Sequence, residues 1–379
     1  MNKTEREFQV FIKPAGASCN LRCSYCYYLE KAGLYKGEGI AVMPDHILEK
    51  YIHDHLEATT DSNVFFSWHG GEPMLAGIDF YKRAISFQQK HNSERKHIMN
   101  GMQTNATLVD DEWCRFLAAN NFYMGVSIDG PEDIHNSYRK AGNGTGSFSE
   151  TIRGYMLLKK YNVQTEILTV VSSTNAILPA EVYGFLKSLG SPFLTFLPLV
   201  ERVAKDSGKV SIASVKPMDF GNFLCAVFDE WVTEDIGSIK IQVIEEALRT
   251  AFMQDHTLCI FKRNCGGVPV VEKNGDFYSC DHFVDVEHLV GNIVDTSLAL
   301  MLDSPKQEAF GAAKSGMLPG YCLKCEVLDM CNGECPKNRF IKTPEGDPGL
   351  NYLCSGYRYF FNHIKPFVDA VSDEYKKSR

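Results

Sequence analysis

The feature of the sequence that most constrains the fold is a group of three cysteines near the amino terminus. Cys19, Cys23 and Cys26 have the spacing C-x3-C-x2-C and follow a short apolar run at residues 8–12. A loop of this kind can place three thiolates around one corner of a four-iron cluster, which needs four ligands. One iron then stays open to a small molecule, and an open metal position favours chemistry over a structural role. A zinc-binding loop or three unrelated buried cysteines are the alternatives.

Eight further cysteines are concentrated towards the carboxyl terminus. They are Cys259, Cys265, Cys280, Cys322, Cys325, Cys331, Cys335 and Cys354. Eight thiols make two complete sets of four, which suits two structural zinc sites or two iron–sulfur clusters. The last two cysteines, Cys114 and Cys225, have apolar neighbours in helical patterns, so we predict that they are small core residues.

The composition is that of a soluble protein with a sizeable core. Of the 379 residues, 44% are hydrophobic and 23% are charged. The net charge of −8 disfavours nucleic-acid binding by bulk electrostatics. No apolar run approaches the roughly 20 residues that span a membrane, and the run at 8–12 is shorter than a signal-peptide core of about 7–15 residues. We therefore expect a cytoplasmic protein, in which thirteen cysteines favour metal or redox use over disulfides.

Strand-like and helix-like segments alternate over residues 1–200. The predicted strands are residues 8–13, 64–68, 97–103, 124–128, 164–171 and 193–197. The predicted helices are residues 44–56, 80–89, 110–119, 148–161 and 180–189. This alternation predicts a parallel sheet of the α/β class with ligands at the loops that follow the strands. Periodicity alone allows either a barrel or a doubly wound sheet.

The rest of the chain divides into two further regions. Residues 201–254 are predicted to form a bridging segment with an amphipathic helix at 218–232. Residues 255–379 contain the cysteine-rich loops and end in a predicted helix at 357–371. The sequence therefore predicts three regions, 1–200, 201–254 and 255–379.

The first cysteine loop, with aromatic residues on both sides of Cys26, resembles the signature of radical S-adenosylmethionine (SAM) enzymes. The resemblance implies a partial (β/α)6 barrel in which the open iron chelates the amino and carboxylate groups of SAM. Reductive cleavage of the sulfonium then gives a 5′-deoxyadenosyl radical. The later cysteines resemble a SPASM domain, which carries two auxiliary [4Fe-4S] clusters that serve in electron transfer. The resemblance assigns Cys259, Cys265, Cys280 and Cys335 to one cluster, and Cys322, Cys325, Cys331 and Cys354 to the other.

Gly70, Gly71 and Glu72 directly follow a predicted strand. Glycines let the backbone approach a ligand closely, and a carboxylate can accept from an ammonium group, although a tight turn also explains the pattern. The resemblance implies that this segment receives the amino group of SAM. Further SAM contacts implied by position are Tyr25, Ser127, Arg139 and Val200. Among them, Arg139 offers a planar guanidinium that suits a carboxylate.

Asp281 directly follows Cys280. An acid anchored beside a cluster can accept a proton while the cluster accepts an electron, although most aspartates in loops are caps or are solvated. Nearly the whole chain resembles the anaerobic sulfatase-maturating enzymes, including the segments at residues 70–77, 103–105 and 129–131. This resemblance implies that Asp281 is the catalytic base.

The same resemblance implies a function, cofactors and partners. The expected reaction is oxidation of a Cys or Ser in an unfolded sulfatase segment to Cα-formylglycine, with three [4Fe-4S] clusters and SAM as cofactors. A reductant of the flavodoxin or ferredoxin type is expected, and no nucleic acid or membrane. Two alternatives stay open. A sibling SPASM enzyme would build a thioether, a crosslink or an epimerised residue on a ribosomal peptide, and a zinc-stabilised module would only bind.

Overall fold

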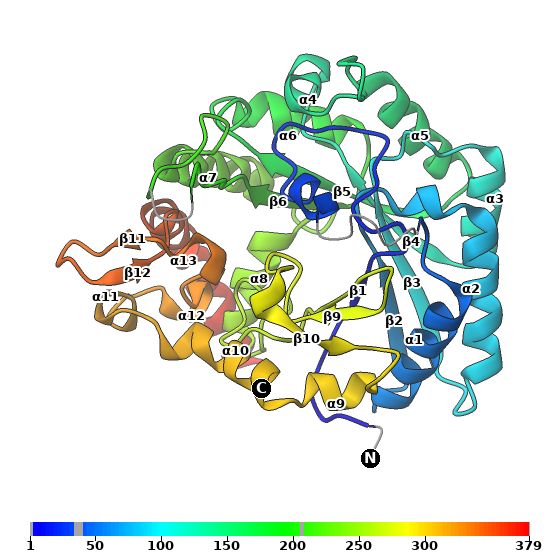
Figure 1. Cartoon of the computed structure of the whole chain (residues 1–379). Helices are drawn as coiled ribbons and strands as arrows, with labels where there is room; N and C mark the ends of the chain where they lie inside the picture. The colour runs from blue at the N-terminus through cyan, green and yellow to red at the C-terminus, as the bar shows by residue number, and fades with distance from the viewer. Residues whose placement is uncertain (1–2, 34–40, 205–207, 379) are drawn as a thin grey trace. The chain divides into compact units, whose positions relative to one another are not determined.

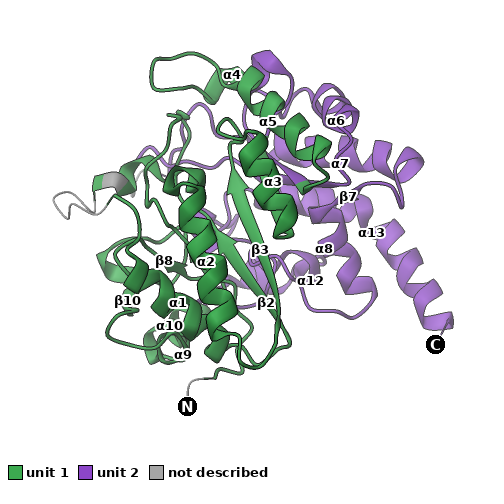
Figure 2. Cartoon of the chain, turned by 90° about the vertical axis from the view of Figure 1, so that its right-hand side faces the viewer, with its two compact units in different colours: residues 1–127, 136–165, 266–311 green, residues 128–135, 166–265, 312–379 purple. Residues whose placement is uncertain are grey.

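The computed structural model describes residues 3–33, 41–204 and 208–378 (Figure 1). These residues form two compact units, and Figure 2 colours them separately. Unit 1 comprises residues 1–127, 136–165 and 266–311, and unit 2 comprises residues 128–135, 166–265 and 312–379. Within the described ranges, no helix has the length and apolar character needed to cross a membrane.

Unit 1 is built on a mainly parallel sheet. Its strands are β1 (Phe11–Ile12), β2 (Asn63–Trp68), β3 (His97–Thr104), β4 (Phe122–Ser127), β8 (Val270–Val271), β9 (Asp276–Tyr278) and β10 (Leu289–Asn292). They lie in the order β10-β9-β8-β1-β2-β3-β4. The strands from β8 to β4 in this order are parallel, and β9 is antiparallel to both of its neighbours, β8 and β10. Since β1 lies between β2 and β8, the segments that follow these three strands meet at one edge of the sheet.

Helices of unit 1 connect and cover these strands. They are α1 (Asp45–Ala58), α2 (Ile78–His91), α3 (Asp111–Ala119), α5 (Phe148–Lys160) and α9 (Leu298–Leu302), with 3₁₀ turns at Leu29–Gly33, Pro73–Ala76 and Val286–His288. Figure 1 shows α1, α2 and α3 on the outer side of β2, β3 and β4. The core there is aromatic: the Trp68 and Tyr81 rings meet edge to face at 5.4 Å, and the Trp68 indole donates to Asn100. Asp110 caps α3 by accepting from the amide of Trp113.

Unit 2 contains the parallel strands β6 (Phe193–Pro198) and β7 (Lys240–Ile241), together with most of β5 (Gln164–Val171). Its helices are α6 (Pro179–Ser188), α7 (Pro217–Glu234), α8 (Gln242–Ala251), α11 (Gly320–Leu323), α12 (Leu328–Cys331) and α13 (Cys354–Lys377), with a 3₁₀ turn at Pro336–Asn338 and a hairpin of β11 (Ile341–Lys342) and β12 (Pro348–Leu350). Helix α13 packs against α7 and α8. The α7–α13 crossing is close, because a Cβ on Gly356 would lie 1.9 Å from the carbonyl oxygen of Pro217. Two helices, α4 (Glu132–Tyr138) and α10 (Pro305–Gly316), have residues in both units.

The predicted strands and helices are confirmed, with ends shifted by a few residues. The longest extension is at the last helix, where the prediction of 357–371 becomes Cys354–Lys377. Cys114 and Cys225 are buried, as expected for core residues. Helix α8 and the short strands β7 to β12 are elements that the sequence patterns did not predict. The division at residues 200 and 254 stays a prediction, since the two units interleave segments of the chain.

Candidate active site

The first cysteine loop follows β1 and keeps its three thiols close together. Cys23 is buried, and Cys19 and Cys26 are half-buried. Burial is the main cause that raises the pKa of Cys19, to about 11. The amide of Leu21, which donates to its sulfur at 3.3 Å, opposes the rise, and Glu72, Cys23 and Cys26 add to it. A thiol that holds its proton this firmly at neutral pH loses it to a bound metal. The donor set therefore fits a metal cluster.

The Gly70–Glu72 segment lies against the residues that precede Cys19. The amide of Gly71 donates to the carbonyl of Gly16, and that of Glu72 to the carbonyl of Ser18, each at 2.8 Å. A Cβ on Gly71 would lie 2.3 Å from the oxygen of Ser18, and Gly70 has a φ of 134°. Both glycines are therefore required by backbone geometry, and they hold the end of β2 directly against the cysteine loop.

Glu72 has a buried and firmly oriented carboxylate. It accepts from the amides of Asn105 and Met74, at 2.8 and 3.1 Å, and from the hydroxyl of Thr104 at 2.9 Å. Burial raises the pKa of Glu72 to about 7, although these donors and the Arg139 charge lower it. A carboxylate has about four acceptor positions, so three internal donors leave room for one further donor from a ligand.

Tyr25 and Arg139 flank the same loop. The backbone of residues 21–24 pairs with that of residues 138–141, and the Arg139 guanidinium donates to the Tyr25 hydroxyl at 2.7 Å. Both side chains are buried. The structure therefore brings a cation that suits a carboxylate next to the cysteine loop.

The other two predicted SAM contacts have different surroundings. Ser127, at the end of β4, is buried and accepts from the side-chain amide of Gln103 on β3 at 2.9 Å. Val200 is buried in unit 2 beyond β6. The contacts of Ser127 and Val200 with SAM stay predictions.

Asp281 belongs to a buried charged cluster in unit 1. Its carboxylate lies 2.5 Å from the ammonium of Lys13, at the end of β1, and it also accepts from the hydroxyl of Tyr27. Burial raises the pKa of Asp281, but Lys13 and His282 outweigh that effect and hold it at about 2. Lys13 is 1% exposed and Asp281 is 7% exposed, so neither charge is solvated. The ion pair therefore keeps Asp281 in the carboxylate form, in a fixed orientation.

A second phenol and a second carboxylate complete this cluster. The Tyr28 hydroxyl donates to Glu272, which follows β8, and the Lys13 ammonium lies 4.3 Å from the centre of the Tyr28 ring. Burial raises the pKa of Glu272 to about 7, against the opposing effects of Tyr28 and Lys13. Since Asp281 remains ionised, Lys13 balances one full carboxylate charge.

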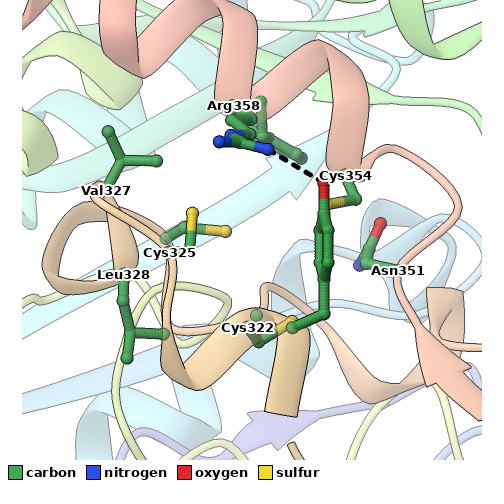
Figure 3. A pocket seen from close by; sticks show the side chains of 11 residues that line it. Cys322, Cys325, Val327, Leu328, Asn351, Cys354 and Arg358 are labelled. Atoms are coloured by element: carbon green, nitrogen blue, oxygen red, sulfur yellow. Dashed lines mark hydrogen bonds between the residues drawn. The ribbon is translucent and has the colours of Figure 1, made fainter. Parts of the chain in front are cut away.

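Four of the later cysteines line one pocket in unit 2 (Figure 3). They are Cys322, Cys325, Cys331 and Cys354. At its rim, Arg358 donates to the hydroxyl of Tyr321 and makes two hydrogen bonds with Glu326, at 2.9 and 3.0 Å. Burial, with a smaller contribution from the neighbouring Cys322 and Cys325, raises the pKa of Cys354 to about 11. Four convergent thiols fit a fully ligated cluster.

The remaining four later cysteines are divided between the units. Cys259, Cys265 and Cys335 lie in unit 2, and each interacts electrostatically with the ammonium of Lys314. Cys280 lies in unit 1, directly before Asp281. The three cysteines of unit 2 therefore share one charged neighbour, as members of one ligand set would.

Comparison with known proteins identifies the family. The Radical SAM superfamily profile matches residues 14–190, and the SPASM profile, an iron-sulfur cluster-binding domain, matches residues 259–326. The serine-type anaerobic sulfatase-maturating enzyme of Bacteroides thetaiotaomicron is 44% identical over 96% of this chain and 91% of its own length. The chain belongs to the anaerobic sulfatase-maturating enzymes.

Two further relatives support this sulfatase-maturating family. The cysteine-type anaerobic sulfatase-maturating enzyme of Clostridium perfringens is 34% identical over 97% of this chain and 99% of its own length. The solved structure of anSMEcpe with bound AdoMet is 33% identical and covers 97% of this chain and 99% of its own, with a TM-score of 0.88. The fold is a radical SAM domain followed by a SPASM domain, and the cofactors of this sulfatase-maturating family member are [4Fe-4S] clusters and SAM.

Sequence patterns missed the partners of Asp281 in this sulfatase-maturating family member. Lys13 ends a predicted strand, where a lysine is normally an exposed residue, and Tyr27 and Tyr28 are ordinary aromatic neighbours of Cys26. One feature of the sequence could have indicated a role for Lys13: it ends an apolar strand that leads into a metal-binding loop. Its partner could not be predicted, because Asp281 comes from a distant segment that β8 and β9 bring beside β1.

Proposed function

We propose that this enzyme oxidises one residue of an unfolded sulfatase segment to Cα-formylglycine. The observation that carries the proposal is the buried Asp281 carboxylate, fixed by Lys13 and Tyr27 in the same unit as the first cysteine loop. When bound, SAM and the clusters supply a radical that removes a hydrogen atom and an acceptor for the second electron. The residues of the chain must then bind these groups, orient the peptide and accept one proton.

The residues around the first cysteine loop are proposed to hold SAM. Cys19, Cys23 and Cys26 provide three ligands of its cluster. Glu72 accepts from the amino group of SAM, and Arg139 binds its carboxylate, because their charges are complementary to these groups. The remaining proposed contacts are Tyr25, Gly70, Gly71, Ser127 and Val200. The close contact of residues 70–72 with the cysteine loop supports this assignment.

The auxiliary clusters are proposed to use the two sets of four cysteines implied by the resemblance. One set is Cys259, Cys265, Cys280 and Cys335, and the other is Cys322, Cys325, Cys331 and Cys354. The single pocket that the second set lines supports this division, as does the common electrostatic neighbour, Lys314, of three members of the first. Four thiolates on each cluster leave no open iron, which suits electron transfer.

Asp281 is proposed to accept the proton of the substrate hydroxyl or thiol. Its side chain is ionised, buried and held by two donors, so it is oriented before substrate binds. Cys280, the preceding residue, is proposed to ligate an auxiliary cluster. The proton and the second electron would therefore leave the substrate on the same side.

We further propose that serine is the target residue. The 44% identical relative from Bacteroides thetaiotaomicron is serine-type, whereas the cysteine-type relative from Clostridium perfringens is 34% identical. The reductant is proposed to be of the flavodoxin or ferredoxin type, in the cytoplasm. Neither nucleic acid nor membrane is expected as a partner, which agrees with the net charge of −8.

The test uses the anaerobically reconstituted enzyme with dithionite, SAM and three sulfatase peptides that carry Ser, Cys or Ala at the target position. We expect about twelve irons per chain. The Ser peptide should lose two hydrogen atoms, and the Ala peptide should remain unchanged. Faster conversion of the Cys peptide would overturn the serine assignment. A thioether, a crosslink or an epimerised residue would overturn the proposed reaction, and a zinc-loaded chain without SAM cleavage would overturn the cofactor assignment.

The Asp281→Asn variant tests the base in the same assay. It should keep its iron and still cleave SAM, but formylglycine production should fall by at least about 100-fold, the usual contribution of a general base. Unchanged production by the iron-loaded variant would exclude Asp281 as the base.

A further inference from the structure

Lys314 is a buried cation in unit 2. It lies in the last turn of α10 and is 1% exposed. Its ammonium donates to the carbonyls of Cys259 and Ile260 at 2.9 and 2.8 Å, so it is fixed at the backbone of a proposed cluster ligand. Lysine is seldom buried this deeply unless an anion balances its charge.

Arg339 is a second cation in the same region of unit 2. Its guanidinium donates to the carbonyls of Gly333, Asn332 and Glu334 at 2.8, 3.0 and 3.1 Å, and also to that of Lys314. These acceptors are all backbone oxygens. The hydrogen bonds therefore orient the guanidinium without neutralising its charge.

The ionisable groups around Lys314 and Arg339 are mainly cysteine thiols. Lys314 interacts electrostatically with Cys259, Cys265 and Cys335, and Arg339 interacts with Cys265, Cys322 and Cys331. In the described part of unit 2, Glu334 is the carboxylate that interacts with both cations, and its own hydrogen bonds come from Asn338 and Asn351. One carboxylate cannot balance both the buried Lys314 and the half-buried Arg339, and an unbalanced buried charge is strongly unfavourable. The thiolates of the bound clusters would supply the missing negative charge.

We propose that Lys314 and Arg339 are built-in countercharges that raise the reduction potentials of the auxiliary clusters. Lys314 acts on the cluster of Cys259, Cys265 and Cys335, and Arg339 acts on both clusters. A cluster with four thiolate ligands is negative and becomes more negative on reduction, so a fixed cation stabilises the reduced form. The cations would thereby make the auxiliary clusters better acceptors of the electron that leaves the substrate. The inference rests on the cluster assignment of the proposed function.

The test measures potentials in the full-length chain. Alanine at Cys19, Cys23 and Cys26 removes the first cluster, so that about eight irons remain and only the auxiliary clusters give electron paramagnetic resonance signals on reduction. In this background Lys314→Gln keeps a hydrogen-bond donor and removes the charge, whereas Lys314→Arg keeps the charge. Lys306→Gln is the matched control, because Lys306 is an exposed lysine of α10 that also donates to a carbonyl, that of Leu289.

We expect Lys314→Gln to lower the ratio of reduced to oxidised cluster at a fixed ambient potential by at least about tenfold for one of the two signals. For a one-electron couple this is a shift of about 59 mV to lower potential. Lys314→Arg and Lys306→Gln should stay close to the background. Loss of iron from Lys314→Gln, with full iron in Lys314→Arg, would also support the inference, because it would show that the cluster needs a positive charge at residue 314.

Two results would overturn the inference. One is an unchanged potential in Lys314→Gln at full iron content. The other is loss of iron from Lys314→Gln and Lys314→Arg alike, which would give Lys314 a purely structural role. If the background chain itself holds no iron, the cluster assignment of the proposed function fails instead. The iron content of the background chain therefore separates the two failures.

Discussion

The Lys13–Asp281 ion pair predicts a large and specific cost for replacing Lys13 with methionine. Methionine keeps the length and apolar stem of lysine but removes its charge. The Asp281 carboxylate would then be buried without its cation, because it is 7% exposed and the hydroxyl of Tyr27, its other donor, carries no charge. The substitution therefore tests whether the charge of Lys13, rather than its bulk, holds Asp281 in place.

The expected magnitude follows from the geometry. At the 2.5 Å separation of the two charges, an effective dielectric constant of ~20 gives an attraction of about 7 kcal/mol before desolvation is counted. Desolvation of both groups cancels part of it, and removing one partner of a buried pair typically costs about 3–5 kcal/mol. We expect Lys13→Met to lower the free energy of unfolding of unit 1 by about 3–5 kcal/mol. The double variant Lys13→Met/Asp281→Asn should recover about 2–3 kcal/mol relative to the sum of the single variants.

Urea unfolding under anaerobic conditions measures these values. In a Trp231→Phe background, fluorescence comes from Trp68 and Trp113, which both belong to unit 1. Lys13→Arg is the control that keeps the charge. A loss within about 0.5 kcal/mol for Lys13→Met, the range of ordinary surface substitutions, would refute the argument. Additive losses in the double variant would show that the two side chains do not act as a pair.

Three further predictions concern other parts of the molecule. Glu72→Gln should weaken SAM binding about 10- to 100-fold, the value of a hydrogen bond to a charged group, whereas exposed Glu112→Gln should not; equilibrium dialysis of labelled SAM measures both. Gly71→Ala should lower the iron content per chain, because its Cβ would lie 2.3 Å from the oxygen of Ser18, while Gly184→Ala, whose Cβ meets no atom within 4 Å, should load normally. Glu246 accepts from His256 at 2.9 Å, and although burial opposes both shifts, the pair lowers the pKa of Glu246 and raises that of His256. His256 therefore contributes its full stabilisation below its ordinary pKa of 6.5 and loses it as the pH rises through its raised pKa. Glu246 contributes its full stabilisation above its ordinary pKa of 4.5 and loses it as the pH falls through its lowered pKa. Urea unfolding from about pH 6 to about pH 9 should show that the free energy of unfolding of the native chain falls at high pH. An equal fall with pH in a His256→Gln variant would contradict this prediction.

The regular elements could be predicted because they depend on local patterns. The strand predicted at 164–171 matches β5 residue for residue, and the helix predicted at 110–119 differs from α3 by its cap, Asp110. Both follow from apolar periodicity and capping, which are properties of neighbouring residues. Strands β8 and β9 have two and three residues, too few to show a period. They were therefore not predictable, although they position Asp281.

The same difference between local and long-range patterns decides which site residues could be predicted. Cysteine spacing predicted which residues would ligate metal, since thiolates are distinctive and the local groups are dense. The separation of Cys335 from its sequence neighbours came only from the family resemblance and stays a prediction. Cys335 interacts with Lys314, whereas Cys322, Cys325, Cys331 and Cys354 line one pocket. Countercharges such as Lys13 were not predicted, because the local sequence does not indicate whether a lysine will be buried.

Within the described residues, Lys13 and Lys314 are the two lysines with less than 2% exposure, and both lie beside residues that are proposed to take part in the redox chemistry. Lys13 already has its anion, Asp281, so its charge is balanced by the polypeptide itself. Lys314 has carbonyl oxygens, thiols and the carboxylate of Glu334 as neighbours, and it shares Glu334 with Arg339, so full balance of its charge depends on thiols becoming thiolates. Because bound metal deprotonates thiols, cluster binding and folding of this region are coupled. We therefore expect the charge of Lys314 to be fully balanced only when the clusters are bound, whereas the charge of Lys13 is balanced by the chain alone.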